Sequence, residues 1–107
     1  MRYEAPETLE AAIALLRSEP GEARVLAGGT DLLVQLKTDL IEPQLVVDIK
    51  KIRELREVRR EAGGYRIGAA VTGAELKEHP ELKAVWPGVI EAANLIGSTQ
   101  IQGRATL

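Results

Sequence analysis

The sequence has no cysteine and no phenylalanine, and its only aromatic residues are one tryptophan and two tyrosines. The missing cysteines exclude a disulfide framework, a thiolate zinc site and a cysteine-ligated iron–sulfur cluster within this chain. The scarcity of aromatic rings predicts an aliphatic core and leaves little surface on which nucleic-acid bases could stack. A chain without cysteine also fits the reducing cytoplasm, where we expect the protein to work.

Long apolar runs and a strong excess of either charge are absent as well. The 107 residues are 28% charged with a net charge of -2, so nothing in them indicates binding to nucleic acid or to a membrane surface. No apolar run approaches the length of a membrane span, and the first residues lack the apolar core of a signal peptide. Because 45% of the residues are hydrophobic, the chain can form a globular domain with its own core.

The polar side chains form no recognisable catalytic set. His79 is the only histidine and precedes a proline, so we expect a solvated residue at a helix end rather than a metal ligand. Acids and arginines alternate between residues 53 and 61, which indicates a solvated face with ion pairs, or alternatively a docking surface. If the chain serves an enzyme, a bound cofactor must therefore supply the chemistry.

Hydrophobic spacing predicts a parallel strand–helix–strand unit in residues 1–52. After a helix over residues 8–18, we expect a strand over residues 24–27, a helix over residues 31–39 and a strand buried on both faces over residues 45–49. A strand, a helix and a second strand in this order form a βαβ unit. The helix at residues 31–39 is expected to turn four leucines inward: Leu32, Leu33, Leu36 and Leu40.

The pattern changes in residues 53–107, which we interpret as the incomplete start of a second unit. Two short apolar runs flank Gly63-Gly64 and predict a hairpin. Thr72 is the expected N-cap of the helix that follows, and Gly97 the expected stop of a later one. The other predicted elements are a helix over residues 72–78, a helix over residues 87–96 and a loop over residues 98–107.

The most informative segment is a strand, a tight turn and a helix start with the sequence Leu26-Ala27-Gly28-Gly29-Thr30-Asp31-Leu32. Unpaired N–H groups at a helix start favour an anion, for which a phosphate or pyrophosphate is the natural candidate. Glycines let the backbone approach such a group closely, since no Cβ collides with phosphate oxygens. The alternative is a purely structural turn, capped by Thr30 or Asp31 and binding no ligand.

Several motifs in the correct order resemble the FAD-binding subunit or domain of the molybdenum hydroxylases, which include xanthine dehydrogenase and aerobic carbon monoxide dehydrogenase. The resemblance covers the whole chain. Its motifs are Ala27-Gly28-Gly29-Thr30-Asp31-Leu32-Leu33 as the first flavin loop, Leu45-Val46-Val47-Asp48-Ile49, Ile67-Gly68-Ala69 with Thr72, Ile96-Gly97-Ser98-Thr99-Gln100-Ile101, and Arg104-Ala105-Thr106-Leu107 as the opening of the second loop.

The resemblance implies an α+β fold made of two α/β subdomains of the FAD-binding PCMH type, related to vanillyl-alcohol oxidase, with the second one truncated. It implies FAD as cofactor and no catalytic side chain. Asp31 would repel a phosphate, so it is expected to cap the helix or to bond to ribose or a bound water. The residues expected to contact FAD are Leu26, Ala27, Gly28, Gly29, Thr30, Asp31, Leu32 and Thr106.

The resemblance further implies partners: a molybdenum-cofactor subunit and a 2Fe-2S subunit, from which FAD would receive electrons for an acceptor. The family's second glycine pair would follow Leu107, so we expect a fragment that is inactive alone and self-associates through open edges. The alternative is a non-catalytic α/β interaction or scaffold module whose Gly28-Gly29 turn is only structural.

Overall fold

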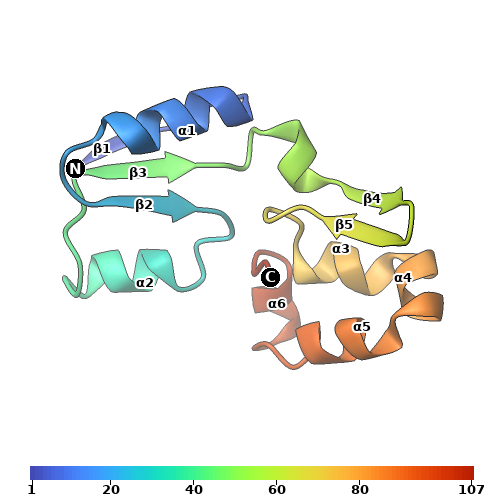
Figure 1. The fold of residues 1–107 in the computed structure, drawn as a ribbon. Coiled ribbons are helices and arrows are strands. Elements are labelled where there is room, and N and C mark those ends of the chain that lie inside the picture. The colour runs from blue at the N-terminus through green and yellow to red at the C-terminus, as the bar shows by residue number, and fades with distance from the viewer.

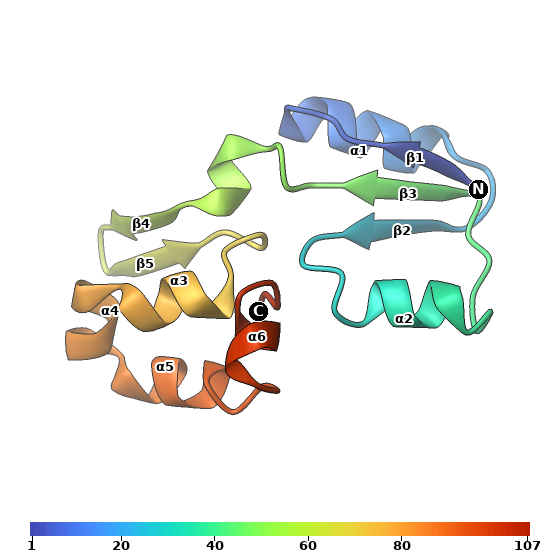
Figure 2. The ribbon, with the colours of Figure 1, turned by 180° about the vertical axis from the view of Figure 1, so that it is seen from behind.

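The computed structural model describes residues 1–107 as two halves that face each other (Figures 1 and 2). The first half is a three-stranded parallel sheet in the order β1-β3-β2, which confirms the predicted βαβ unit. The extra strand β1 pairs Tyr3 with Val46 and is too short to show a pattern in the sequence. The elements of this half are β1 (Arg2–Glu4), α1 (Leu9–Ser18), β2 (Ala23–Leu26), α2 (Leu32–Lys37) and β3 (Leu45–Asp48).

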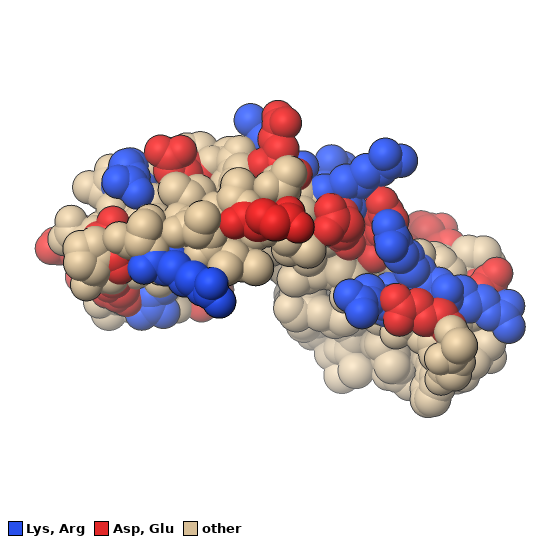
Figure 3. All heavy atoms as spheres, turned by 45° about the horizontal axis from the view of Figure 1, so that its top comes forward, with Lys and Arg blue, Asp and Glu red and all other residues tan.

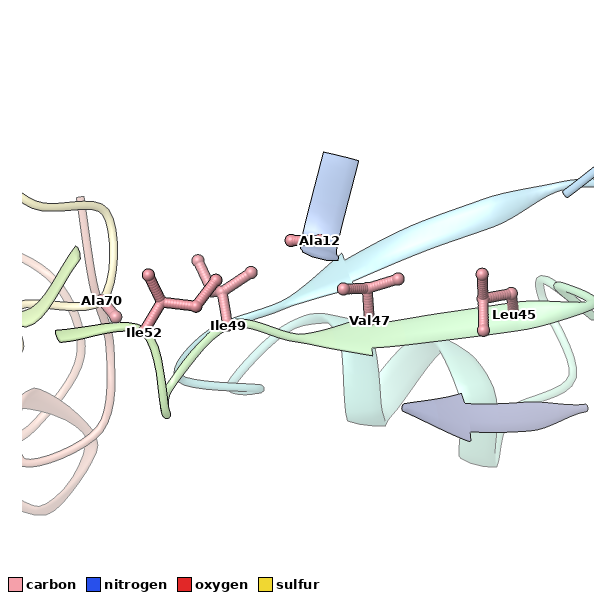
Figure 4. Packing of buried hydrophobic residues seen from close by; sticks show 6 residues of the cluster. All are labelled: Ala12, Leu45, Val47, Ile49, Ile52 and Ala70. Carbon is pink, nitrogen blue, oxygen red and sulfur yellow. The ribbon is translucent and has the colours of Figure 1, made fainter. Parts of the chain in front are cut away.

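The central strand β3 organises the first core. All of its residues are buried, as the apolar run predicts for a strand covered on both faces. Figure 4 shows one hydrophobic cluster along this strand, made of Ala12, Leu45, Val47, Ile49, Ile52 and Ala70. Because Ala70 belongs to the second half, the cluster crosses the predicted boundary at residue 52 and ties the two halves together.

The second half is an antiparallel hairpin followed by four short helices. The hairpin turns at Gly63, whose φ of +85° explains the glycine there. Its elements are η1 (Arg53–Arg56), β4 (Val58–Glu61), β5 (Gly64–Ile67), α3 (Gly73–Glu78), α4 (Pro80–Val85), α5 (Pro87–Ala93) and α6 (Thr99–Gln102). Their core is a second cluster of Val71, Leu76, Leu82, Ile90 and Ala93. No helix in the chain has the length and apolar character that a membrane crossing requires.

Helix α2 differs from the prediction in its burial. None of its residues is buried, and Leu33 and the following Leu40 are 41% and 73% exposed. No other helix or strand packs extensively against it. The spacing of the leucines correctly predicted a helix, but helical spacing alone does not show that another element covers the apolar face.

Residues 98–107 were wrongly predicted to be a loop, because they contain α6. Ser98 caps this helix, and its Oγ accepts a hydrogen bond from the N–H of Ile101. The buried side chain of Gln102 donates to the carbonyl of Asn94 at 2.9 Å and to that of Ile96 at 3.4 Å. The segment looked like a loop because a polar side chain, not an apolar stripe, makes its buried contacts.

His79 lies between α3 and α4, which confirms the predicted position at a helix end, but it is half-buried rather than solvated. Its Nδ1 accepts a hydrogen bond from the N–H of Leu82 at 3.2 Å, and its ring lies edge-on to that of Tyr65. The histidine therefore acts as a helix cap, a role that its position before a proline did not reveal.

Candidate functional site

The two loops singled out in the sequence line one cavity at the carboxyl ends of β2 and β3. Figures 1 and 2 show the C-terminal segment facing these strand ends. The cavity has a volume of about 260 Å³ and is lined by Ala27, Gly28, Lys50, Ala70, Thr72, Gly103, Arg104 and Thr106. Both charged residues of the lining are cationic, two others carry hydroxyl groups, and no carboxylate belongs to it. This composition suits an anionic ligand, at the edge where open α/β sheets commonly bind one.

Gly28 holds the two loops together. A Cβ at this position would overlap the carbonyl oxygen of Arg104 and lie only 3.3 Å from the Cα of Ala105. The glycine therefore allows the first loop to lie directly against the backbone of the second. Any larger residue would push the loops apart and widen the cavity.

Gly29 turns the chain from β2 toward α2. Its φ is +78°, a left-handed conformation that favours glycine, and a Cβ here would lie 2.9 Å from the side chain of Leu33. The backbone N–H groups of residues 27–32 donate no hydrogen bond within the chain. A series of unpaired backbone donors at such a turn is able to bind phosphate oxygens.

Asp31 does not cap α2, so this part of its expected role was wrong. It occupies the N-cap position, but its carboxylate makes no hydrogen bond to the helix backbone. Its Oδ2 accepts instead from the side-chain amide of Gln35 at 2.6 Å, one turn further along the exposed surface. The backbone donors before the helix are therefore left without a side-chain partner, in contrast to the capped turn considered as the alternative.

The predicted contact residues are only partly brought together. Ala27, Gly28 and Thr106 line the cavity, although Thr106 lies far from the others in the sequence. Leu26 is buried at the end of β2, residues 29–31 continue the loop and Leu32 begins α2, and none of these belongs to the lining.

Sequence reasoning missed Lys50, Thr72 and Arg104 as residues of the cavity. One signal could have found Lys50. It closely follows a buried strand, just as Ala27 follows β2, and the carboxyl ends of parallel strands meet at the same edge of a sheet.

Asp48 anchors Lys50 beside the cavity. Its Oδ1 accepts from the N–H of Lys50 and its Oδ2 from the ammonium of Lys50, both at 2.9 Å, and the hydroxyl of Tyr3 donates to the same Oδ2. Burial acts to raise the pKa of Asp48, but these hydrogen bonds outweigh it and hold the pKa below its ordinary value of 3.8. The carboxylate in turn raises the pKa of the Tyr3 hydroxyl, mainly by accepting its hydrogen bond.

Comparison with known proteins gives consistent matches over the whole chain. Residues 1–107 match the family described as the FAD binding domain in molybdopterin dehydrogenase. The chain is 37% identical over 105 residues to the carbon monoxide dehydrogenase medium chain of Hydrogenophaga pseudoflava, covering 98% of this chain and 37% of that protein. It is 40% identical over 105 residues to the putative xanthine dehydrogenase FAD-binding subunit of Escherichia coli K12, covering 97% of this chain and 36% of that protein.

The fold agrees with the sequence comparison. A solved structure of carbon monoxide dehydrogenase from Hydrogenophaga pseudoflava, lacking the Mo-pyranopterin moiety of the molybdenum cofactor, superimposes with a TM-score of 0.92 and 37% identity, over 99% of this chain and 37% of that one. The chain thus spans a little over a third of the length of these relatives. On the match over all 107 residues, the chain belongs to the family of FAD-binding domains of molybdopterin dehydrogenases.

Proposed function

We propose that this chain binds FAD through its pyrophosphate group and is the FAD-binding component of a molybdenum-containing hydroxylase or dehydrogenase. The observation that carries this proposal is the meeting of the two loops: unpaired backbone donors of residues 27–32 lie beside an acid-free cavity that holds Lys50 and Arg104. Family membership supplies the identity of the ligand.

The residues present fit a pyrophosphate group. Ala27 and Gly28 keep the first loop free of bulk, while Thr72 and Thr106 place hydroxyl groups in the lining. Backbone N–H groups, hydroxyls and cations are the donors that phosphate oxygens accept from in proteins. FAD, when bound, would supply the electron transfer, and the chain's own residues would bind and orient it.

We further propose that the chain works with a molybdenum-cofactor subunit and a 2Fe-2S subunit, passing electrons from them through FAD to an acceptor. One relative is named the medium chain of carbon monoxide dehydrogenase, and another an FAD-binding subunit.

We also propose that residues 1–52 and 53–107 correspond to the two subdomains of a PCMH-type, vanillyl-alcohol oxidase-like fold. A parallel sheet in one half and an antiparallel hairpin in the other support this division.

A scaffold module with a purely structural turn remains the second candidate, and one observation favours it. Both glycines have a reason within the chain itself, since Gly28 packs on Arg104 and Gly29 has a positive φ. Under this candidate the turn would be required for folding and would bind nothing.

Titration of the chain with FAD, followed by flavin fluorescence and calorimetry, distinguishes the two candidates. We expect saturable binding, and we expect riboflavin, which lacks the pyrophosphate, to bind much more weakly. Thr106→Val should weaken FAD binding by about threefold to tenfold, as expected for one lost hydrogen bond. Thr99→Val, an exposed threonine outside the lining, is the matched control.

Two outcomes would contradict the proposal. Absence of saturable FAD binding would show that this chain does not hold FAD by itself. Equal affinity for riboflavin and FAD would show that the cavity does not recognise a pyrophosphate.

A further inference from the structure

The charged residues of the cavity lining are Lys50, which follows β3, and Arg104, which follows α6. We propose that Lys50 and Arg104 form a clamp for the pyrophosphate group, and that Tyr3 and Asp48 fix the position of Lys50. This inference rests on the proposed function, because it names the side chains that neutralise the phosphates of FAD.

The backbone of Arg104 is held firmly on both sides. Its N–H donates to the carbonyl of Ile101 at 2.9 Å, and its own carbonyl lies against Gly28. The guanidinium has no ion-pair partner in the chain, although six ion pairs are formed elsewhere. A planar guanidinium presents several N–H donors in a fixed geometry that matches phosphate oxygens, so Arg104 is suited to pair with an incoming phosphate.

Lys50 is preorganised by a single buried carboxylate. Asp48 is only 5% exposed and binds both the backbone N–H and the ammonium of Lys50, so the long side chain folds back toward its own strand. The ammonium remains accessible, since the side chain of Lys50 is 48% exposed. An already ordered cation loses less conformational freedom when a ligand binds than a freely rotating one does.

Tyr3 completes this arrangement from the neighbouring strand. Its hydroxyl donates to the same carboxylate oxygen that holds the ammonium, across 45 residues of sequence. A donor from β1 and donors from the turn after β3 restrict the rotation of Asp48, and through it the position of Lys50. Tyr3 and Asp48 are therefore positioning residues, while Lys50 and Arg104 would contact the phosphates.

Titration of the chain with inorganic pyrophosphate, followed by backbone amide NMR shifts, tests the clamp without any flavin. We expect Lys50→Met and Arg104→Met each to weaken pyrophosphate binding by about tenfold, the loss expected for one charge-assisted hydrogen bond. Lys51→Met is the matched control, because it removes an equal charge from the next residue, which lies outside the lining. Equal losses in all three variants, or none in the first two, would overturn the clamp.

A double-mutant cycle tests the positioning role. Tyr3→Phe should weaken pyrophosphate binding by about threefold in the original chain and have no effect in the Lys50→Met background. A merely structural role would give the same loss in both backgrounds and would overturn the positioning role. Asp48→Asn should give the same result as Tyr3→Phe, with weaker pyrophosphate binding in the original chain and no effect in the Lys50→Met background. Lys50→Arg should recover part of the affinity that Lys50→Met loses. Circular dichroism should confirm that each variant is folded.

Two results distinguish a failure of the Lys50–Arg104 clamp from a failure of FAD binding. If pyrophosphate binds and depends on Lys50 and Arg104 but FAD does not bind, the clamp is supported and the assignment to FAD is wrong. If FAD binds equally to the original chain and to both variants, FAD binding stands and the clamp is wrong.

Discussion

At the scale of single residues, Asp48 connects the fold to the candidate site. It is the one buried carboxylate of the chain, it ends the central strand β3, and its oxygens accept three hydrogen bonds from Tyr3 and Lys50. A buried charge is tolerated only when it is paired and hydrogen-bonded in this way. The residue therefore contributes to folding stability through the same bonds that orient Lys50.

Asp48→Asn should lower the free energy of unfolding at pH 7 by about 1–3 kcal/mol, because it weakens charge-assisted bonds to both partners. The native pKa lies below the ordinary value of 3.8, so this stabilisation is present above that pH and disappears as the pH falls through the native pKa. The difference between the two chains in urea unfolding should therefore shrink below pH 3.8. A difference that is constant down to the acid transition would contradict this account. Glu91→Gln, an exposed acid without an ion pair, is the control.

Gly28→Ala should destabilise the chain by about 1–3 kcal/mol, because the new Cβ would overlap the carbonyl oxygen of Arg104. Gly88→Ala is the matched control, since a Cβ in α5 at that position meets no atom within 4 Å and alanine favours a helix. Thermal unfolding should show a lower midpoint for the first variant and an equal or higher one for the second. Equal midpoints for Gly28→Ala and the original chain would mean that the loops are not in contact.

At the scale of elements, α6 determines whether the second loop reaches the cavity. It is a single turn of helix, too short to be stable alone. Its position depends on Gln102, whose side-chain amide donates to the carbonyl of Asn94, the C-cap of α5, and to that of Ile96, the residue before Gly97. The predicted helix over residues 87–96 was wrong at its end, because α5 ends at Ala93 with Asn94 as its C-cap, and Gly97, with a φ of +57°, lies in the turn that follows.

Gln102→Ala should therefore cost about 1–3 kcal/mol, because two backbone carbonyl groups lose the donor that the buried side chain supplies. Gln100→Ala removes the same side chain from an exposed position of α6 and should change stability by less than about 0.5 kcal/mol. Urea unfolding measures both, and amide hydrogen exchange of residues 99–106 should increase selectively in the first variant. Equal effects of the two substitutions would show that the buried amide does not hold the helix.

At the scale of the whole molecule, the surface combines mixed charges with exposed apolar side chains. Figure 3 shows Lys and Arg interspersed with Asp and Glu across one face, and the acids and arginines of residues 53–66 form several of the ion pairs. This supports the prediction of a solvated charged face. Large apolar residues are nevertheless exposed, with Leu95 at 85% and Trp86 at 51%.

These exposed side chains sustain the prediction that the chain self-associates at high concentration. Light scattering coupled to size-exclusion chromatography should give a mass that rises with concentration above the 11.6 kDa of one chain. Trp86 lies beside an apolar groove that also includes Ile67 and Val89, so Trp86→Lys should reduce this association. A mass of one chain at every concentration would contradict the prediction.

Elements with local signals could be predicted from the sequence. The apolar run of residues 45–49 predicted the buried central strand, the pair Gly63-Gly64 predicted the hairpin, and Thr72 was correctly expected to cap α3, accepting from the N–H of Glu75. Each of these signals depends on the periodicity or the chemistry of neighbouring residues. The turn at Gly28 and Gly29 belongs with them, because two adjacent glycines between an apolar strand and a helical pattern are a local signal too.

Contacts between residues far apart in the sequence could not be predicted from it, because only the tertiary structure brings these residues together. The contact of Gly28 with Arg104, the place of Lys50 beside both, and the bond from Tyr3 to Asp48 join segments that are far apart in the sequence. The exposure of α2 and the capping role of His79 likewise follow from the packing of the whole chain. Such contacts depend on how strands and helices pack, and the local pattern of a segment does not specify what will lie against it.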